Sequence, residues 1–436
     1  MELNGLYFID SDMGYTMEEA VKEAKRCLNC KNPTCVDGCP INNYIPEFIQ
    51  EIAKGNFGEA SEIIGRKSNL PAICGRVCAH DLQCEGHCIL KKAGKEIKIG
   101  KLERFVADFD HSMKLKSEKI PRKTRGKVAV IGSGPAGLTI AGDLAKEGFN
   151  VVVYEALEEP GGILLYGIPD FRLQKDVVRR EIKKIESYGV NFETSVVAGE
   201  DFTLDSLFKH GFDAVFIGTG TNVSNNLDLP GKDLKGIELS SYFLRTSMLA
   251  NEGKLSVDEV IVKEGDHVIV IGAGNVAMDS ARTAIRIGAA DVTVVYRRSQ
   301  KDMPALDIEY QGALRENVKF SFNTTPHEYI GENGQVTGLK VMTEEGEAIY
   351  RADAVLVAIG SRPAKRIVST TKGIDVNDKG YVITKEKPYG MTTLKGVFAG
   401  GDVVHEPATV VRAMKEAKKV AEGIAAYVDA KILLDL

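Results

Sequence analysis

All eight cysteines of the 436-residue chain lie in one short segment. The segment runs from Cys27 to Cys88, and the 348 residues after it contain no cysteine. The spacing is Cys27-x2-Cys30-x4-Cys35-x3-Cys39-Pro40, followed by Cys74-x3-Cys78-x5-Cys84-x3-Cys88. Iron–sulfur clusters are held by cysteine thiolates, and closely spaced cysteines completed by a more distant one are typical of their sites. The spacing therefore predicts iron–sulfur clusters in this segment.

Two features bear on the kind of metal site. The Cys39-Pro40 pair resembles the end of the bacterial ferredoxin motif, in which the last cysteine serves the other cluster. Zinc is the main alternative, because Cys-x2-Cys spacing with His80 and His87 nearby also suits a tetrahedral zinc site. A purely structural role for so many crowded thiols fits a reducing cytoplasm poorly. Iron–sulfur binding is the hypothesis that the spacing favours.

A first glycine loop indicates a dinucleotide site. The apolar run Lys127–Ile131 precedes G-x-G-x-x-G, and the next strand, Val151–Tyr154, ends at Glu155. Such a loop between a strand and a helix binds a pyrophosphate at the helix N-terminus, and the acid accepts hydrogen bonds from ribose hydroxyls. The loop residues expected at this site are Gly132, Gly134, Pro135, Ala136 and Gly137.

Further glycine turns favour a flavin nucleotide in this first site. Turns follow the acid and end later strands, and each of them alone could be a plain strand end. The segment 396–402 (GVFAGGD) reads as a strand that returns to the first fold. The turn residues expected beside the flavin are Gly162, Gly167, Thr219, Gly220, Gly401 and Asp402.

A second glycine loop begins 140 residues after the first and indicates an NADPH site. The run His267–Ile271 precedes it, and the next strand, Asp291–Val295, is followed by Arg297 and Arg298 instead of an acid. Guanidinium groups at this place would bind the 2′-phosphate of NADP, although they could also be solvated residues at a strand end. The other residues expected here are Gly272, Gly274, Asn275, Val276, Ala277 and Gly360.

Helices are expected before the first loop, and alternating strands and helices after it. Residues 15–26 read as a helix with Thr16 and Glu19 as a capping box. Further helices are expected at 46–53, 57–64 and 101–115, without strand signals between them. After the basic linker 121–126, the alternation is typical of βαβ units.

Composition and charge exclude several classes of partner. The chain has 56 Lys and Arg against 61 Asp and Glu, a formal net charge of −5, which gives no sign of a nucleic-acid partner. Its longest apolar stretches are far shorter than the roughly 18 residues that read as a membrane span. The acidic N-terminus, MELNGLYFIDSDMG, lacks the basic region of a signal peptide. We expect a cytoplasmic protein without a membrane partner.

Taken together, the motifs resemble a known family over nearly the whole chain. The chain is similar to the small (beta) subunit of bacterial glutamate synthase. Relatives of that subunit are the flavin, NADP and iron–sulfur half of dihydropyrimidine dehydrogenase and the large subunit of the flavin-bifurcating NADH-dependent ferredoxin:NADP oxidoreductase. The motifs that carry the resemblance are Cys27–Pro40, Pro71–Cys88, Gly100–Phe105, Gly132–Gly137, Tyr166–Leu173 (YGIPDFRL), Gly272–Asp279, Tyr296–Ala305 and Gly400–Val403.

The resemblance implies an α/β fold with an N-terminal all-α domain at 1–120 that holds two 4Fe–4S clusters. Two interleaved Rossmann-like, glutathione-reductase-like domains would follow. The FAD domain is expected at 121–236 and 366–436, and the NADPH domain at 237–365. We also expect cofactor contacts from Arg172, Thr409 and Val410.

The resemblance also implies a ligand set for each cluster. One cluster would be held by Cys27, Cys30, Cys35 and Cys88. The other would be held by Cys39, Cys78, Cys84 and Glu103. Cys74 would then be no ligand, whereas a simple pairing of the two cysteine groups would use all eight thiols. Spacing alone does not choose between the two schemes.

The implied function is that of an electron-input subunit. NADPH would reduce FAD, and the clusters would carry single electrons to a partner subunit, most simply the FMN-barrel large subunit of glutamate synthase. No catalytic side chain is expected, because hydride transfer is cofactor chemistry. The domains fill the chain, so the acceptor site is expected on another chain of a hetero-oligomer.

Four alternatives stay open at this point. The chain could be the large subunit of a bifurcating ferredoxin:NADP oxidoreductase with a flavin and iron–sulfur partner. It could be the electron-input subunit of a pyrimidine dehydrogenase, or a partner-free NADPH oxidoreductase. The alternative outside enzymes is a redox-sensing flavoprotein.

Overall fold

The computed structural model describes residues 14–114 and 121–434, which form two compact units. Unit 1 comprises Tyr166–Arg172 and Val223–Arg362. Unit 2 comprises the described parts of Asp12–Leu165, Leu173–Asn222 and Pro363–Leu436. The N-terminal residues for which no signal peptide is expected lie almost wholly outside the described residues. The three domain boundaries expected from the sequence stay a prediction.

Residues 14–114 form a helical domain within unit 2, and this part of the chain contains no strand. Thr16 Oγ1 accepts a hydrogen bond from Glu19 N, and Glu19 Oε2 accepts one from Thr16 N, which confirms the capping box. The helices expected from periodicity form, and Leu115 lies outside the described residues. The helices are α1 (Met17–Ala24), α2 (Thr34–Gly38), α3 (Ile45–Lys54), α4 (Phe57–Gly65), α5 (Pro71–Val77), the 3-10 helix η2 (Ile89–Ala93) and α6 (Ile99–Met113).

A seven-stranded sheet forms the rest of unit 2, in the order β15-β16-β17-β4-β1-β2-β3. The strands are β1 (Lys127–Ile131), β2 (Asn150–Tyr154), β3 (Asn191–Glu193), β4 (Ala214–Ile217), β15 (Thr384–Glu386), β16 (Tyr389–Thr392) and β17 (Val397–Ala399). The central strands β1 to β4 are parallel, and β17 pairs with β4 in parallel. The segment GVFAGGD thus returns to the sheet of the first glycine loop.

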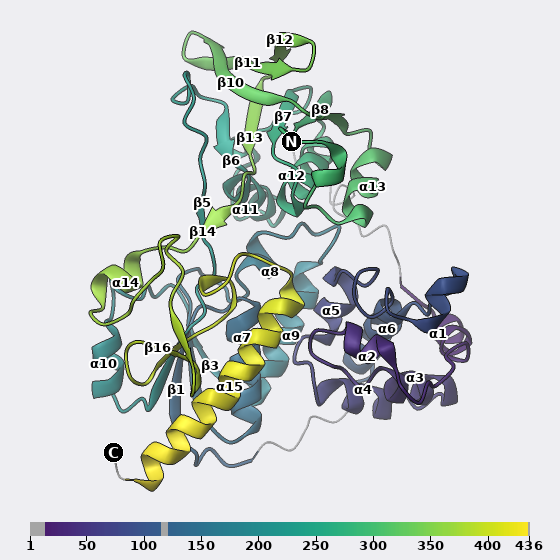
Figure 1. Cartoon of the computed structure of the whole chain (residues 1–436), viewed down its shortest axis with the longest axis vertical. Helices are drawn as coiled ribbons and strands as arrows, with labels where there is room; N and C mark the ends of the chain where they lie inside the picture. Colours follow the sequence, from purple (N-terminus) through teal and green to yellow (C-terminus); the bar gives the residue numbers. More distant parts are fainter. Residues whose placement is uncertain (1–13, 115–120, 435–436) are drawn as a thin grey trace. The chain divides into compact units, whose positions relative to one another are not determined.

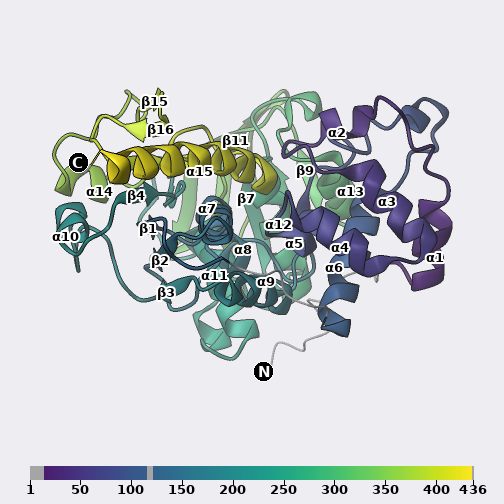
Figure 2. The same cartoon turned by 90° about the horizontal axis from the view of Figure 1, so that it is seen from below.

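Helices cover this sheet and join it to the helical domain. They are α7 (Pro135–Lys146), α8 (Ile163–Tyr166), α9 (Lys175–Ser187), α10 (Leu204–Lys209), α14 (Arg366–Thr370), the 3-10 helix η5 (Gly401–Val403) and α15 (Val410–Leu433). The long helix α15 lies along α7, and Lys418 forms a 2.7 Å ion pair with Asp143 between them (Figures 1 and 2). Asn69 of the helical domain donates to the same carboxyl at 2.7 Å.

Unit 1 is built on a parallel five-stranded sheet in the order β6-β13-β7-β8-β9. These strands are β6 (Ile237–Leu239), β7 (His267–Ile271), β8 (Asp291–Val295), β9 (Lys319–Ser321) and β13 (Ala354–Val357). Its helices are α11 (Ser240–Asn251), α12 (Asn275–Ile287), α13 (Asp307–Arg315) and the short 3-10 helices η3 (Val257–Glu259) and η4 (Gln300–Asp302).

Two small antiparallel sheets complete unit 1. One consists of β10 (Thr325–Glu332), β11 (Gln335–Thr343) and β12 (Gly346–Arg351), and the other pairs β5 (Val223–Ser224) with β14 (Ser361–Arg362). Among the helices of residues 14–114 and 121–434, none is both long and apolar enough to cross a membrane.

Candidate functional site

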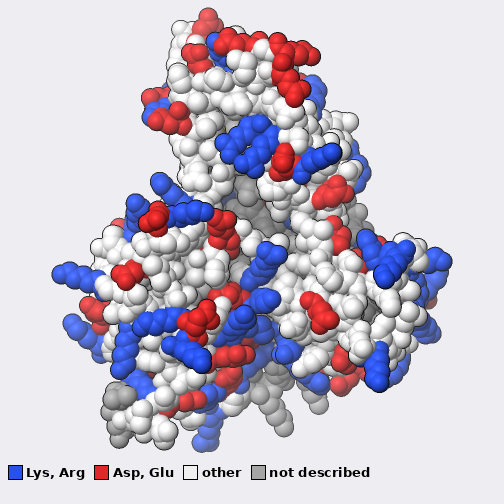
Figure 3. Space-filling model, viewed as in Figure 1, with Lys and Arg blue, Asp and Glu red and all other residues white. Residues whose placement is uncertain are grey.

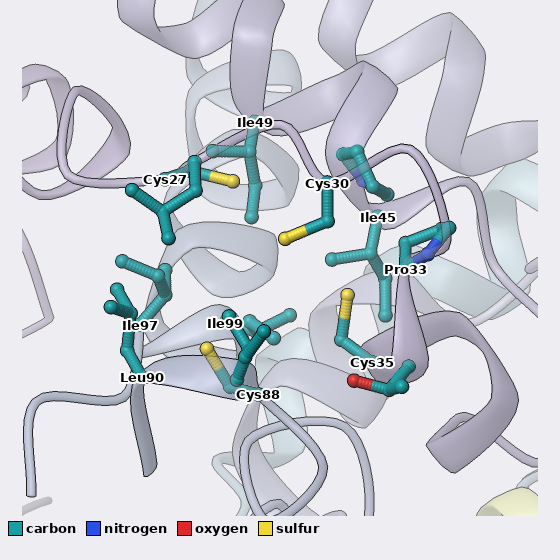
Figure 4. A pocket seen from close by; sticks show the side chains of 14 residues that line it. Cys27, Cys30, Pro33, Cys35, Ile45, Ile49, Cys88, Leu90, Ile97 and Ile99 are labelled. Carbon is teal, nitrogen blue, oxygen red and sulfur yellow. The ribbon is translucent and has the colours of Figure 1, made fainter. Parts of the chain in front are cut away.

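Four cysteines from two distant segments line one pocket of the helical domain (Figure 4). Cys27 and Cys30 lie in the loop after α1, Cys35 lies in α2, and Cys88 directly precedes η2. Thr34 Oγ1 donates to His87 O at 2.6 Å, which joins the two segments. The rest of the lining is largely apolar and includes Ile45, Ile49, Leu90, Ile97 and Ile99.

Gly38 allows the segment of Cys35 to lie against the segment of Cys88. A Cβ built on Gly38 would lie 2.6 Å from Cγ of His87, so only glycine lets α2 approach the segment before Cys88. Burial raises the pKa of the Cys35 thiol to about 12, and the neighbouring Cys27 and Cys88 act in the same direction. Such thiols become thiolates together only when a metal neutralises their charge.

A second group of side chains gathers where α5 and α6 touch. A Cβ on Gly75 would lie 2.6 Å from the backbone nitrogen of Arg104, so the two helices are in close contact. Cys78, the C-cap residue of α5, is near enough to Glu103 for the carboxylate charge to raise its pKa. Burial raises the pKa of Cys39 to about 11 and that of Cys84 well above its usual value, and the Glu103 charge adds to both shifts. Cys39, Cys78, Cys84 and Glu103 therefore influence one another electrostatically.

Glu103 is an unusual acid for the interior of a helical domain. Its side chain is 8% exposed, and burial raises its pKa to about 8, with the charge of Glu181 as the second cause. A buried carboxylate is costly unless a cation or hydrogen-bond donors compensate it. A cluster iron beside Cys39, Cys78 and Cys84 would supply that cation, so the donor set fits a second cluster with three sulfur ligands and one oxygen ligand.

Cys74 lies beside this second group. Its hydrogen bond with Cys78 is the first cause that raises the pKa of Cys78. The Cys74 sulfur also lies 3.9 Å from Ser68 Oγ. Within the described parts of the chain, no three His, Cys, Asp or Glu side chains are close enough together to hold a single metal ion. The assignment of ligands to each cluster stays a prediction.

The first glycine loop meets two other turns in unit 2. A Cβ built on Gly162 would lie 2.9 Å from Cα of Gly134, and one on Gly401 would lie 2.9 Å from Cβ of Ala136. Gly132 lies against the strand end at Gly218 and Thr219. The structure thus brings together Ala136 and Gly401, which are 265 positions apart in the sequence. Such converging backbone turns fit a long nucleotide cofactor.

Polar groups at these turns fit the same kind of ligand. Glu155 Oε2 accepts hydrogen bonds from the backbone and the hydroxyl of Ser133, at the end of β2. Thr409 Oγ1, at the N-terminus of the 24-residue helix α15, is buried and has no hydrogen-bond partner among the described residues. Burial raises the pKa of Asp402 to about 6. These groups and the N-termini of α7 and α15 are suited to the ribose and phosphates of a flavin nucleotide.

Sequence reasoning missed Ser133, which connects two of these turns. Besides binding Glu155, its hydroxyl accepts a hydrogen bond from Gly161 N at 2.9 Å. The signal was present, because Ser133 occupies the first variable position of the glycine motif. The role of the hydroxyl becomes evident only in the structure, where the Gly161 turn lies against the loop.

The second glycine loop occupies the equivalent place in unit 1. A Cβ on Gly272 would lie 2.3 Å from Ala358 O, so the turn packs directly on the end of β13. Gly274 is the N-cap of α12, and Asn275 Oδ1 accepts from Leu306 N at 2.9 Å. Val276 is exposed and Ala277 is fully buried at the start of this helix. The loop leaves the helix N-terminus available to a pyrophosphate.

Arg297 and Arg298 follow β8 after Tyr296, and both side chains are exposed. In the described residues neither guanidinium forms an ion pair, and only the backbone oxygen of Arg298 accepts a hydrogen bond, from Asn323 N. Uncompensated guanidiniums beside a dinucleotide loop fit the 2′-phosphate of NADP. Gly360 lies at the neighbouring strand end, where its carbonyl accepts from Asn225 N.

Gly167 and Arg172 belong to the segment Tyr166–Arg172 of unit 1 and not to the unit of the first loop. Arg172 is engaged by protein carboxylates: its guanidinium lies 2.8 Å from both Asp279 and Glu309. Arg282 extends this network to Glu309 and stacks over Phe171. The contact of Gly167 and Arg172 with a cofactor stays a prediction.

Comparison with known proteins places these sites in a family. Residues 6–115 match the family model described as dihydropyrimidine dehydrogenase domain II, 4Fe-4S cluster. Residues 126–417 match the pyridine nucleotide-disulphide oxidoreductase family. The first match supports iron–sulfur over zinc in the cysteine segment, and both matches identify an oxidoreductase.

Individual proteins are similar over most of the chain. The glutamate synthase [NADPH] small chain of Halomonas elongata is 38% identical and aligns over 95% of this chain and 92% of its own. The NADPH-Fe(3+) oxidoreductase subunit beta of Geobacter sulfurreducens is 34% identical over 91% of this chain and 63% of its own.

A solved structure shares the fold of the nucleotide-binding part. FprA from Mycobacterium tuberculosis matches with a TM-score of 0.58 and 19% identity over 71% of this chain and 86% of its own. The chain belongs to the pyridine nucleotide-disulphide oxidoreductase family, and within it to the group of glutamate synthase small chains and their relatives that carry an N-terminal 4Fe–4S domain.

Proposed function

We propose that the chain is an electron-input subunit that oxidises NADPH and delivers electrons through two 4Fe–4S clusters to a partner subunit. The partner would be the FMN-barrel large subunit of a glutamate synthase. The observation that carries the proposal is the separation of the sulfur ligands into two groups. Cys27, Cys30, Cys35 and Cys88 line one pocket, whereas Cys39, Cys78 and Cys84 lie with Glu103.

The residues of the nucleotide sites bind and orient in this proposal. Gly134 and the N-terminus of α7 would hold the pyrophosphate of FAD, and Glu155 would hold its ribose. Arg297 and Arg298 would hold the 2′-phosphate of NADPH. When bound, FAD accepts two electrons as hydride and releases them singly. The isoleucines around Cys27 and Cys88 would exclude water from the cluster.

The chain differs from dithiol enzymes of the same family in one respect. The 348 residues after Cys88 contain no cysteine, so no thiol pair exists in either nucleotide-binding fold. Electrons would therefore leave through the helical domain. The name of the Halomonas relative, a small chain, supports a hetero-oligomer. None of the eight cysteines forms a disulfide, which supports our proposal of a cytoplasmic location.

A second candidate differs only in the acceptor. The Geobacter relative is named as the beta subunit of an NADPH-Fe(3+) oxidoreductase, which favours an electron-input role outside glutamate synthesis. The sites for NADPH and FAD would be the same in both cases. The partner that co-purifies with the chain distinguishes the two candidates.

Anaerobic titration of the purified protein with NADPH tests the proposal. We expect about eight irons and one FAD per chain, because each 4Fe–4S cluster has four irons. NADPH should bleach the flavin absorbance, and electron paramagnetic resonance should then detect reduced clusters. Zinc without iron, or a flavin that NADPH does not reduce, would overturn the proposed function.

A further inference from the structure

The pocket of Cys27, Cys30, Cys35 and Cys88 opens at a surface with exposed apolar side chains. Leu28 follows Cys27 and is 61% exposed, and Ile89 follows Cys88 and is 54% exposed. Both residues also line the pocket. Two large apolar side chains that flank a functional pocket and still face solvent are typical of the centre of a protein interface.

Positive charge surrounds these apolar side chains. The two segments that carry the four cysteines, 24–36 and 86–95, contain six cations and no carboxylate, and Glu23, Asp37, Glu85 and Glu96 directly flank them. Their six cations are all exposed and form what we call the basic rim: Lys25, Arg26, Lys31, Lys91, Lys92 and Lys95. Figure 3 shows Lys and Arg side chains gathered on the outer edge of the helical domain. The basic rim is positively charged, whereas the whole chain has a net charge of −5.

Most of this charge has no partner within the molecule. Arg26 pairs with Glu23 and donates to the backbone oxygen of Lys95 at 2.6 Å, which joins the two segments. Lys91 lies 3.8 Å from Glu96. Among the described residues, Lys25, Lys31, Lys92 and Lys95 form no ion pair. The rim therefore has positive charge available for an external surface.

The second group of ligands is the more buried one. Cys84 and Glu103 are buried, whereas Cys39 and Cys78 are half-buried like the four cysteines of the pocket. Electron exit would therefore be most direct at the Leu28 and Ile89 face.

We propose that this face, with Leu28 and Ile89 at its centre and the basic rim around it, docks an acidic redox protein that accepts electrons. The proposal rests on the exit of electrons through the helical domain in the proposed function, and on its second candidate, in which the acceptor is not the large subunit of glutamate synthase. Complementary charge would accelerate the encounter and orient the partner, and the apolar centre would hold it in contact. Leu28 and Ile89 would then be covered beside the outermost cluster.

The test uses the holoenzyme and an acidic bacterial-type ferredoxin as the probe, with a basic c-type cytochrome for comparison. The rim variant is Lys92→Glu/Lys95→Glu. The control variant, Lys209→Glu/Lys372→Glu, changes the net charge equally at exposed lysines outside the rim. Association and dissociation rates are measured at several salt concentrations. Iron content and flavin reduction by NADPH are measured separately, and their loss would indicate failure of the proposed function instead.

We expect the rim variant to bind ferredoxin about tenfold more slowly at low salt, with a difference that shrinks as salt screens the charges. Leu28→Ser should mainly accelerate dissociation. Unchanged ferredoxin binding in the rim variant would overturn the proposal, as would an equal loss in the control variant. Preferential binding of the basic cytochrome to the wild-type protein would also overturn it.

Discussion

The sulfur atoms of Cys74 and Met414 lie 3.5 Å apart. Cys74 belongs to α5 of the helical domain, and Met414 lies in the first turns of α15, the helix that begins after Thr409. Both side chains are buried. The contact therefore packs the neighbour of a proposed cluster ligand, Cys78, against the helix whose N-terminus lies at the proposed flavin site.

Cys74→Ala should leave the iron content at about eight per chain, because the cysteine is not a ligand in the proposed scheme. It should lower the free energy of unfolding by roughly 1–2 kcal/mol, the usual cost of a small buried truncation. Iron analysis and denaturant unfolding measure the two effects. Cys78→Ala is the matched control and should lose one cluster. Loss of half the iron in Cys74→Ala would instead make Cys74 a ligand.

Glu103→Ala should change one cluster and spare the other, since only the second group of ligands contains this residue. Glu103→Gln retains an oxygen ligand and should keep the cluster with a shifted potential. Electron paramagnetic resonance of the reduced protein measures both effects. Glu59→Gln, which alters an exposed acid on α4 of the same domain, serves as the control. An unchanged spectrum in Glu103→Ala would refute the ligand role.

Arg298→Glu should reduce the preference for NADPH over NADH roughly 10- to 150-fold, because a hydrogen bond to a charged group contributes about 1.5–3 kcal/mol. The ratio of kcat/KM for the two nucleotides in flavin reduction measures this preference. Arg315→Glu reverses an exposed charge on α13 and should not alter it. An unchanged ratio in Arg298→Glu would show that the 2′-phosphate lies elsewhere.

Arg172→Met should destabilise unit 1 by roughly 3–5 kcal/mol, because it leaves the buried Asp279 without its 2.8 Å partner. Arg172→Met/Asp279→Asn should recover part of the loss, since the neutral amide costs less to bury. Thermal unfolding of the single and double variants measures the coupling. If the double variant loses as much stability as the sum of the losses from Arg172→Met and Asp279→Asn, the two residues are not energetically coupled. A loss of FAD without loss of stability would favour the cofactor role.

Glu238→Gln should stabilise the protein at pH 8 more than at pH 5. Burial raises the pKa of Glu238 to about 7, and its Oε2 is buried without a hydrogen-bond partner among the described residues. The wild-type fold therefore loses stability as the pH rises from about 4.5 to 7. We expect a gain of roughly 2–4 °C in Tm at pH 8, as for about 1 kcal/mol. Glu332→Gln, at an exposed acid, is the control. An equal gain at both pH values would show that ionisation of Glu238 does not destabilise the fold.

Local features of the fold were predictable because they depend on neighbouring residues. The Thr16–Glu19 capping box forms as expected. The two glycine loops each follow a strand, β1 or β7, and each begins a helix. At these places the structure depends on the conformational freedom of glycine and on the hydrogen bonds of a helix N-terminus. Both involve residues only a few positions apart.

Contacts between distant segments were not predictable from periodicity. The approach of Gly38 to His87 and of Gly75 to Arg104 brings the cysteine segments together, and neither has a local signal. The network of Arg172 with Asp279 and Glu309 was also missed, because the sequence places Arg172 far from both carboxylates.

The sequence by itself determined the types of ligand, the two dinucleotide loops and the lack of any thiol after Cys88, because these follow from residue identity and short-range spacing. Only the tertiary structure decided which cysteines share a pocket, that Glu103 is buried beside the others, and that Leu28 and Ile89 face solvent. The physical reason is that burial and proximity arise when helices pack. Packing depends on side chains that are far apart in the sequence.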